Sequence, residues 1–253
     1  MALISLLLLA ALLPHLSHSA SVDVEMLIVN GTEAKPHSRP YMVSVQGNKK
    51  HMCGGFLVSP LFVMTAAHCW KSLKETRVTA VIGAHDLNGN DFDRIPIKEH
   101  HINPKFRDGN DPSNDIMLLK LERSAANSKN AALIAIPEIN GDTKEGELCT
   151  VSGWGRTRTN GTPSNVLLEA KIRVFSNKDC KAHWDFKNIL CAGGYHRGFC
   201  TGDSGSPLVC NRTAVGIASF FDKDNCDTPK KPNGYTNISA FLPWIRGIIN
   251  GTK

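Results

Sequence analysis

Short apolar runs separated by turn residues are the feature that most constrains how this chain folds. The runs are only a few residues long, are rich in Val, Ile, Leu and Phe, and show no sustained helical period. Such runs, bounded by Gly, Pro, Ser or Asn, are typical of β-strands. Many short strands at close spacing favour an all-β barrel or sandwich. The clearest runs are 42–45, 54–58, 62–65, 78–82, 116–121, 148–151, 166–174, 207–209 and 215–220.

The runs fall into two groups, which predict two β units within residues 28–253. The first group covers roughly residues 28–130 and the second roughly residues 131–240. Residues 125–136 contain few turn signals and are interpreted as the connection between the units. Residues 241–249 instead place apolar side chains at helical spacing, which predicts a short C-terminal helix that packs on the body.

The first twenty residues differ in kind from the rest. Leu3 to Leu13 is almost entirely Leu, Ile and Ala, and Ser17-His18-Ser19-Ala20 follows shortly after. This order is typical of a secretory signal peptide over residues 1–20, although no Lys or Arg precedes the apolar run. A membrane anchor is the alternative, but a span needs about 20 apolar residues. We therefore expect a chain without a membrane span, either secreted or stored in a secretory granule.

Eight cysteines occur, all after residue 50, and none forms a C-x-x-C pair. Closely spaced cysteine pairs would favour zinc, whereas an even number in a secreted chain favours disulfides. Spacing alone does not choose among the many pairings that eight cysteines allow.

The formal net charge is +6, and the basic residues are dispersed. No arginine-rich tract or nucleic-acid motif is present, so nucleic acid is not an expected partner. Two interpretations of the charge remain open. It is either an ordinary basic surface or a surface retained on sulfated glycans, since positive fields attract polyanions.

The segment from Cys200 to Cys210 is the strongest candidate for chemistry. Ser204 is flanked by glycines in Gly202-Asp203-Ser204-Gly205, and residues without a Cβ leave backbone N–H groups free to hold an oxyanion. A serine hydroxyl is a weak nucleophile and needs a base and a group that orients the base. His68 in Ala66-Ala67-His68-Cys69 and Asp115 in Asn114-Asp115-Ile116 are the candidates. The alternative is a serine in an ordinary turn.

These motifs, in the order His, Asp, Ser, resemble the chymotrypsin-like (trypsin-family) serine proteases. Ile28-Val29-Asn30-Gly31 and Gly153-Trp154-Gly155 extend the resemblance to nearly all of residues 28–250. Within that family the chain is similar to the neutrophil elastase, granzyme and mast-cell protease group. The resemblance implies two six-stranded antiparallel β-barrels, with the active site in the cleft between them and a short C-terminal helix.

The resemblance also implies a serine endopeptidase with an acyl-enzyme mechanism. His68 would be the general base, Asp115 its orienting group and Ser204 the nucleophile, and the N–H groups of Gly202 and Ser204 would form the oxyanion hole. No metal or organic cofactor is expected. The implied disulfides are Cys53–Cys69, Cys149–Cys210, Cys180–Cys191 and Cys200–Cys226.

An inactive precursor is a further implication. Residues 21–27 would be a propeptide, and cleavage between Leu27 and Ile28 would free an amino group that pairs with Asp203. His51 stands where some precursors of the family hold that aspartate in reserve. Because Leu27 is neither Arg nor Lys, we expect an activating enzyme that is not trypsin-like.

The residues that would bind substrate predict a narrow primary pocket. Gly198 at its base supplies no negative charge for Arg or Lys, and Phe199, Phe221 and Asn233 would fill it from several sides. A filled pocket rejects large side chains, so we expect cleavage after small to medium aliphatic residues. The complete predicted set is Gly198, Phe199, Thr201, Ser219, Phe220, Phe221 and Asn233.

Two alternatives to this activity stay open. One is a non-catalytic, basic glycan-binding or antimicrobial protein, and the other is an intact triad behind an occluded pocket. The expected partners are protein or peptide substrates, serpin-type inhibitors and sulfated glycans, and the expected state is a monomer. Sequons at Asn160, Asn211, Asn237 and Asn250 are candidate glycan sites, whereas Asn30 adjoins the activation cleavage and is not expected to be used.

Overall fold

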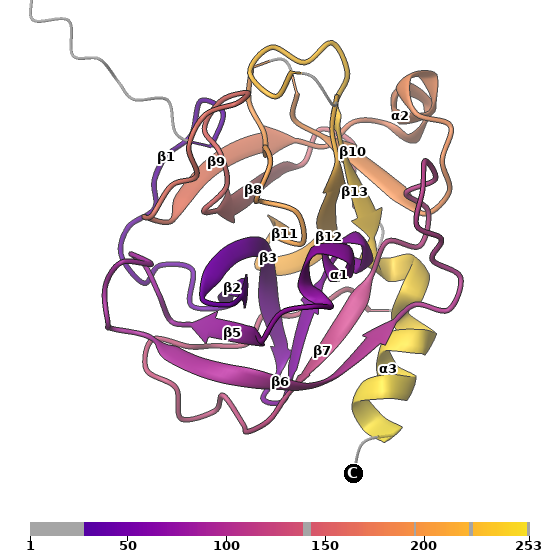
Figure 1. Ribbon diagram of the computed structural model, residues 1–253. Helices are drawn as coiled ribbons and strands as arrows, with labels where there is room; N and C mark the ends of the chain where they lie inside the picture. The colour runs from indigo at the N-terminus through magenta and orange to yellow at the C-terminus, as the bar shows by residue number, and fades with distance from the viewer. Residues whose placement is uncertain (1–27, 139–142, 195, 223–224, 252–253) are drawn as a thin grey trace, which may run out of the picture.

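Two β-structures lie one against the other in the computed structural model of the chain (Figure 1). The structure describes residues 28–138, 143–194, 196–222 and 225–251. The predicted signal peptide and propeptide, including Leu27, therefore lie outside the described residues.

The first unit is a closed antiparallel barrel of six strands in the order β2-β3-β4-β7-β6-β5. Its interior is filled by apolar side chains from every strand, among them Val43, Phe56 and Leu119, which have no exposed surface. The strands are β2 (Met42–Gly47), β3 (Lys50–Ser59), β4 (Phe62–Thr65), β5 (Val78–Ile82), β6 (Asp93–Ile102) and β7 (Met117–Leu121).

The second unit is a seven-stranded antiparallel sheet in the order β1-β9-β8-β11-β12-β13-β10. Its strands are β1 (Thr32–Glu33), β8 (Leu148–Gly153), β9 (Leu168–Arg173), β10 (Ile189–Ala192), β11 (Pro207–Cys210), β12 (Thr213–Phe220) and β13 (Asn233–Asn237).

The seventh strand is a difference from the predicted six-stranded barrel, and it is β1. This two-residue strand has exposed side chains and adds to the outside of β9 through backbone pairing of Thr32 with Glu169. Because β1 contributes no buried side chain, the apolar pattern of the sequence could not reveal it. The other six strands match the implied number, although β10 and β13 were not among the predicted apolar runs. An isolated bridge between Val174 and Ala192 links the ends of β9 and β10.

The helices are few and short. A 3₁₀ turn, η1 (Ala67–Cys69), runs into α1 (Trp70–Leu73) in the first unit. In the second unit, Ser176 caps α2 (Asn177–His183) by accepting a hydrogen bond from the Asp179 N–H. None of the helices in the described ranges is long and apolar enough to cross a membrane.

The C-terminal helix joins the two units. A 3₁₀ turn, η2 (Ile238–Phe241), follows β13 directly and continues into α3 (Leu242–Gly251). Although β13 belongs to the second unit, α3 lies beside the first barrel (Figure 1). Its Leu242 and Ile245 are buried in the same apolar cluster as the interior of that barrel. The predicted helix over residues 241–249 thus corresponds to α3, and it packs on the body as expected.

The units also meet at the serine of the Gly-Asp-Ser-Gly segment. The Gly54 N–H of β3 donates to the Ser204 carbonyl at 2.8 Å. Gly205 has φ +87°, and a side chain there would collide with Thr65 and the Gly54 backbone. Glycine is therefore required at position 205 for the close approach of the two units.

Candidate active site

His68 and Asp115 are brought together by strand pairing in the first barrel. η1 follows β4, Asp115 precedes β7, and β4 pairs with β7 so that Thr65 faces Met117. His68 donates from Nδ1 to Asp115 Oδ2 at 2.7 Å and from its backbone N–H to Oδ1 at 2.9 Å. These two bonds fix both the orientation and the tautomer of the imidazole. Its Nε2 is consequently the atom left to accept a proton.

Asp115 is itself anchored from the second unit. Its side chain is 2% exposed, and its Oδ2 accepts a hydrogen bond from Ser219 Oγ at 2.5 Å. Thr236 Oγ1 donates to the Asp115 backbone carbonyl at 2.8 Å. Sequence reasoning assigned Ser219 to substrate binding and missed Thr236, because neither contact is local in sequence. The structure gives the Ser219 hydroxyl a role in holding Asp115.

The environment of His68 favours its protonated form. Burial lowers the pKa of His68, but the charge of Asp115 and the hydrogen bond to it, with a smaller effect of Asp108, raise the pKa above its ordinary value of 6.5. A base with a raised pKa takes a proton more readily from a hydroxyl, provided that it is neutral at the working pH.

Ser204 lies against the same corner of the first barrel. Its carbonyl accepts the Gly54 N–H and lies 3.8 Å from Cys69 Sγ, in the residue that follows His68. In the structure described, no hydrogen bond joins the Ser204 hydroxyl to His68. Catalytic hydrogen bonds are often long before substrate is bound and then tighten, so the lack of this bond does not exclude proton transfer.

The segment predicted to form the oxyanion hole, Gly202 to Ser204 (the oxyanion segment), begins with a glycine in a left-handed conformation. Gly202 has φ +100°, and a Cβ there would lie 3.0 Å from Gly155 Cα. Its carbonyl is fixed by His51, whose Nε2 lies 2.9 Å away, while His51 Nδ1 lies 2.8 Å from Ser44 Oγ. Because a carbonyl only accepts, Nε2 carries the proton and Ser44 donates to Nδ1.

His51 is a neutral histidine. Burial lowers its pKa to about 4, and the hydrogen bond to Gly202 opposes that change only in part. The expectation that His51 holds Asp203 is wrong for this structure, because the ring binds the Gly202 carbonyl instead. The Asp203 carboxylate is occupied elsewhere. Sequence reasoning missed Ser44 altogether, since nothing in its local pattern points to His51.

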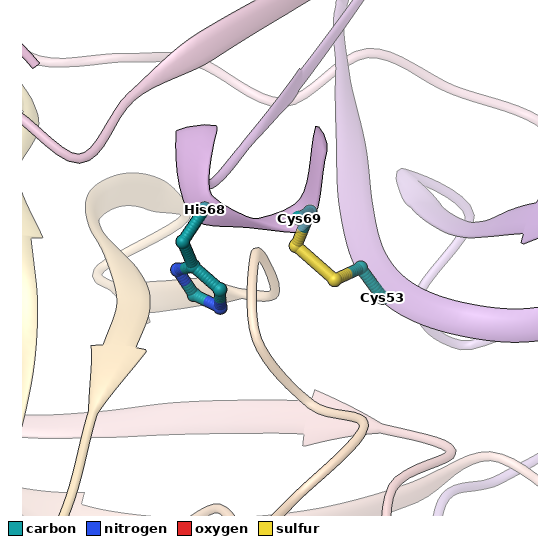
Figure 2. Close-up of side chains that lie close together, drawn as sticks. All are labelled: Cys53, His68 and Cys69. Atoms are coloured by element: carbon teal, nitrogen blue, oxygen red, sulfur yellow. A yellow bond between two sulfur atoms is a disulfide. The ribbon is translucent and has the colours of Figure 1, made fainter. Parts of the chain in front are cut away.

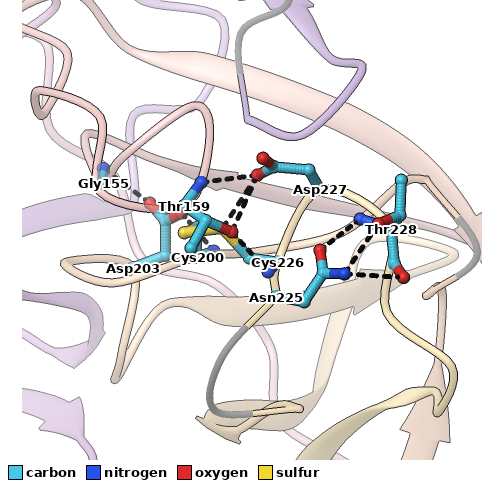
Figure 3. The surroundings of a disulfide bond; sticks show 8 residues. All are labelled: Gly155, Thr159, Cys200, Asp203, Asn225, Cys226, Asp227 and Thr228. Carbon is cyan, nitrogen blue, oxygen red and sulfur yellow. Dashed lines mark hydrogen bonds between the residues drawn. A yellow bond between two sulfur atoms is a disulfide. The ribbon is translucent and has the colours of Figure 1, made fainter.

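Asp203 is fully buried and is held by backbone N–H groups. Gly155 donates to Oδ1 at 2.7 Å and Cys200 donates to Oδ2 at 3.1 Å (Figure 3). Burial raises the pKa of Asp203 to about 7, against the lowering effect of these two bonds. Ile28 is also fully buried, and its φ of +33° is strained for a β-branched residue.

Four disulfides cross-link the described chain. They are the pairings that the family resemblance implies: Cys53–Cys69, Cys149–Cys210, Cys180–Cys191 and Cys200–Cys226. The last ties the segment before Ser204 to the loop after β12. In that loop the Cys226 N–H donates to Thr159 Oγ1 at 3.0 Å, and Thr159 Oγ1 donates to Asp227 at 3.1 Å (Figure 3).

Cys53, His68 and Cys69 are close enough together to suggest a metal site, but their chemistry does not fit one (Figure 2). Both sulfur atoms belong to the Cys53–Cys69 disulfide and cannot be thiolate ligands. The grouping reflects how the disulfide fixes η1, and with it His68, against β3.

The predicted pocket residues converge on one another. The Asn233 carboxamide lies over Gly198, where any added Cβ would collide with Oδ1. Asn233 is 1% exposed, and its Oδ1 has no hydrogen-bond partner among the described residues. Phe199 is fully buried and packs edge-on against Phe221, with ring centroids 5.7 Å apart.

The remaining predicted pocket residues lie around this cluster. Phe220 covers Gly234 of β13 and packs edge-on against Trp184, with ring centroids 5.1 Å apart. Thr201 is exposed beside the oxyanion segment. Tyr235, which was not predicted, is fully buried beside this cluster, with its ring centroid 5.1 Å from that of Phe199.

The candidate glycan sites differ in accessibility. Asn160, Asn211 and Asn250 are exposed, whereas Asn237 is half-buried. The Asn237 side chain caps η2 by accepting hydrogen bonds from the N–H and the hydroxyl of Ser239. Because Asn237 is half-buried, the exposed Asn160, Asn211 and Asn250 are more accessible for modification.

The sequence is similar to those of known serine-protease-family proteins. The family model described as Trypsin matches residues 28–245. Granzyme F of Mus musculus is 39% identical over 230 residues, which cover 86% of this chain and 89% of granzyme F. Duodenase-1 of Bos taurus is 38% identical over 263 aligned positions, with 99% and 98% covered.

The fold is also similar to those of solved structures. Human heparin binding protein is 33% identical and superimposes with a TM-score of 0.80, covering 89% of this chain and 98% of its own. Mouse neuropsin, a serine protease, gives a TM-score of 0.79 at 31% identity, covering 87% and 98%. The chain therefore belongs to the trypsin family, the chymotrypsin-like serine proteases.

Proposed function

We propose that this chain is a serine endopeptidase that works through an acyl-enzyme. The observation that carries the proposal is the buried Asp115 carboxylate, which accepts two hydrogen bonds from His68 and one from Ser219. A structural histidine does not need both its Nδ1 and its backbone N–H bound by one buried carboxylate, an arrangement that leaves Nε2 as the ring atom able to accept a proton.

The reaction follows from these positions. His68 Nε2 takes the proton of the Ser204 hydroxyl as Ser204 attacks the substrate carbonyl, and the N–H groups of Gly202 and Ser204 stabilise the oxyanion. His68 then gives the proton to the leaving amine, and the peptide bond breaks. Water attacks the acyl group by the same route in reverse, with His68 again as base, and restores free Ser204.

Activation would follow cleavage between Leu27 and Ile28. Asp203 is buried and forms no ion pair with any residue that the structure describes, and Ile28 is buried in a strained backbone conformation. A free amino group at Ile28 would relieve the backbone restraint and supply a positive charge for Asp203. A buried carboxylate is stable when a cation pairs with it, so the cut chain would hold the oxyanion segment more firmly.

The primary pocket would accept small to medium aliphatic side chains. Asn233 fills the space over Gly198, and Phe199 and Phe221 close it from the side. No carboxylate lies among these residues, so a basic substrate side chain would find no counter-charge. Leu, Val, Ala and Met before the scissile bond are the expected choices.

The same observations support a second candidate, in which the triad is intact and the pocket is occluded. Phe199 has no exposed surface and Asn233 has 1%, so the base of the pocket is covered. Such a protein would react with small serine-directed reagents and would turn over no peptide.

We further propose that the protein acts after secretion or from a secretory granule, on protein or peptide substrates and as a monomer. Serpin-type inhibitors and sulfated glycans are the proposed partners. The trypsin-family relatives and the four disulfides support an oxidising, extracellular-type compartment.

The test is peptide turnover by protein that begins at Ile28, with a library varied at the residue before the cut and Ser204→Ala as the control. Cleavage after Val, Ala, Leu or Met that disappears in the control supports the whole proposal. Cleavage mainly after Arg or Lys would refute the pocket assignment alone. Labelling of Ser204 without any turnover would favour the occluded site.

A further inference from the structure

A cavity of about 430 Å³ lies at one end of the first barrel, outside the triad and the primary pocket. It forms where the β2–β3 turn meets the beginning of β5 and of β6. Three of its six lining residues are cationic and none is acidic. The lining residues are Asn48, Lys49, Arg77, Thr79, Arg94 and Pro96.

Two of the cations stand on fixed backbone. Asn48 and Lys49 have φ +49° and +67° and form the tight turn between β2 and β3. The Asn48 N–H donates to the Arg77 carbonyl at 3.1 Å, and the Arg77 N–H donates to Asn48 Oδ1 at 3.0 Å. Lys49 and Arg77 are thus held beside each other although their charges repel.

The third cation, Arg94, is half-buried and bound only by neutral groups. Its Nη1 donates to Gln46 Oε1 at 2.8 Å and to Thr79 Oγ1 at 2.9 Å. The neighbouring Asp93 is occupied by Arg123 and Ser128. Across the described part of the chain, none of the three cavity cations forms an ion pair.

A hydrogen-bond chain connects this cavity to the oxyanion segment. Arg94 binds Gln46, Gln46 Nε2 donates to Ser44 Oγ at 3.0 Å, Ser44 binds His51, and His51 binds the Gly202 carbonyl. The residues of this hydrogen-bond network are buried or half-buried. The network connects the cavity, through three side chains after Arg94, to Gly202, whose N–H would stabilise the oxyanion.

The cavity belongs to the first unit, whereas the predicted primary pocket belongs to the second. The primary pocket is built from β12, β13 and the segment before Ser204, all in the second unit. β3 approaches Ser204 from the other unit, through the Gly54 bond to the Ser204 carbonyl. At about 3.3 Å per residue, Lys49 is about 16 Å along the chain from Gly54, a distance spanned by about five residues of extended peptide.

We propose that this cavity binds acidic side chains of a protein substrate, four or five residues after the scissile bond. The inference rests on the proposed endopeptidase function. Carboxylates suit the site because unpaired cations at fixed positions bind them through charge-assisted hydrogen bonds. A compact cavity at the end of one barrel, with the other basic residues dispersed over the surface, favours a short acidic segment over a long sulfated chain.

The test uses two peptides that are identical except at the fourth and fifth residues after the cut, which are Glu-Glu in one and Gln-Gln in the other. The variant is Lys49→Asn with Arg77→Gln, because Asn tolerates the left-handed backbone at position 49. The matched control is Lys178→Gln with Lys181→Gln, which removes two exposed charges from α2. All proteins begin at Ile28.

We expect a kcat/KM about three- to tenfold higher for the Glu peptide, mainly through a lower KM. The preference should shrink at high salt, disappear in the variant and persist in the control. Equal cleavage of both peptides by the unmodified protein, or a preference that survives in the variant, would overturn the inference.

Binding of both peptides to Ser204→Ala protein measures the same preference without turnover. If neither peptide is cleaved but the Glu peptide binds more tightly through Lys49 and Arg77, the catalytic proposal fails while the cavity assignment stands. If a heparin-derived oligosaccharide needs these two residues and neither peptide does, the cavity is a glycan site and the inference is wrong.

Discussion

The carboxamide of Asn233 lies directly over the α-carbon of Gly198, so that even a methyl group at position 198 would overlap it. This relationship sets the size of the pocket that we assign to the substrate residue before the cut. Asn233 belongs to β13 and pairs with Ala192 of β10, so its backbone is fixed by the sheet. We therefore expect the pocket to be shallow, because a strand residue occupies its space.

Asn233→Gly should therefore deepen the pocket. We expect kcat/KM for a peptide with Phe before the cut to rise about tenfold or more, while that for Val falls because it loses packing. The glycine in β13 should lower the free energy of unfolding by about 0.5–1 kcal/mol. Parallel assays of Phe and Val peptides, normalised to titrated Ser204, measure this. An unchanged ratio of the two would place the pocket elsewhere.

The buried Asn233 Oδ1, which has no partner among the described residues, predicts a second preference. Thr and Val have nearly the same shape, but only Thr offers a hydroxyl that either atom of the carboxamide can bind. An unpaired buried polar atom costs about 1–3 kcal/mol, so Thr should be cleaved about three- to tenfold faster than Val at low substrate. Asn233→Leu keeps the approximate volume and should abolish the preference, whereas equal rates in the unmodified protein would contradict it.

Short motifs and local periodicity in the sequence were enough to predict most of the strands and the candidate catalytic residues. The sequence placed His68 and Asp115 at the ends of apolar runs, and strand pairing then joins them. It did not predict the bonds of Ser219 and Thr236 to Asp115, or those of Ser44 to His51, because each partner lies on a different strand. It also assigned His51 to Asp203, since residue spacing does not show which of two neighbouring groups a side chain will reach.

The pH dependence of turnover should reflect the raised pKa of His68. His68 acts as a base only when it is neutral, so activity should fall as the pH drops through that pKa. The acid limb of kcat/KM should therefore have its midpoint above pH 6.5. Asp115→Asn removes the charge that raises the pKa, so the midpoint should move to lower pH and kcat should fall about 10⁴-fold. A midpoint at or below 6.5 in the unmodified protein would contradict this reasoning.

Ser44 should influence the rate without touching substrate. It donates to His51 Nδ1, and His51 binds the Gly202 carbonyl, which belongs to the peptide between the two proposed oxyanion donors, the N–H groups of Gly202 and Ser204. Ser44→Ala should lower kcat about three- to thirtyfold, since one oxyanion donor contributes about 10²–10³ and would be only partly misplaced. KM for a short peptide should change little, and Ser44→Thr should restore the rate. A rise in KM with constant kcat would argue against a positioning role.

Asp203 should make the uncut chain lose stability as the pH rises. Its folded-state pKa of about 7 lies above the ordinary value of 3.8, so folding favours the protonated form. This contribution is complete below pH 3.8 and is lost between pH 3.8 and 7, on the order of 4 kcal/mol. Urea unfolding of the uncut chain from pH 4 to 8, with disulfides intact, should show a free energy of unfolding that falls as the pH rises. This fall should be nearly absent in Asp203→Asn and after cleavage before Ile28, when the free amino group pairs with the carboxylate. Equal slopes in all three proteins would mean that Asp203 does not sense the cut.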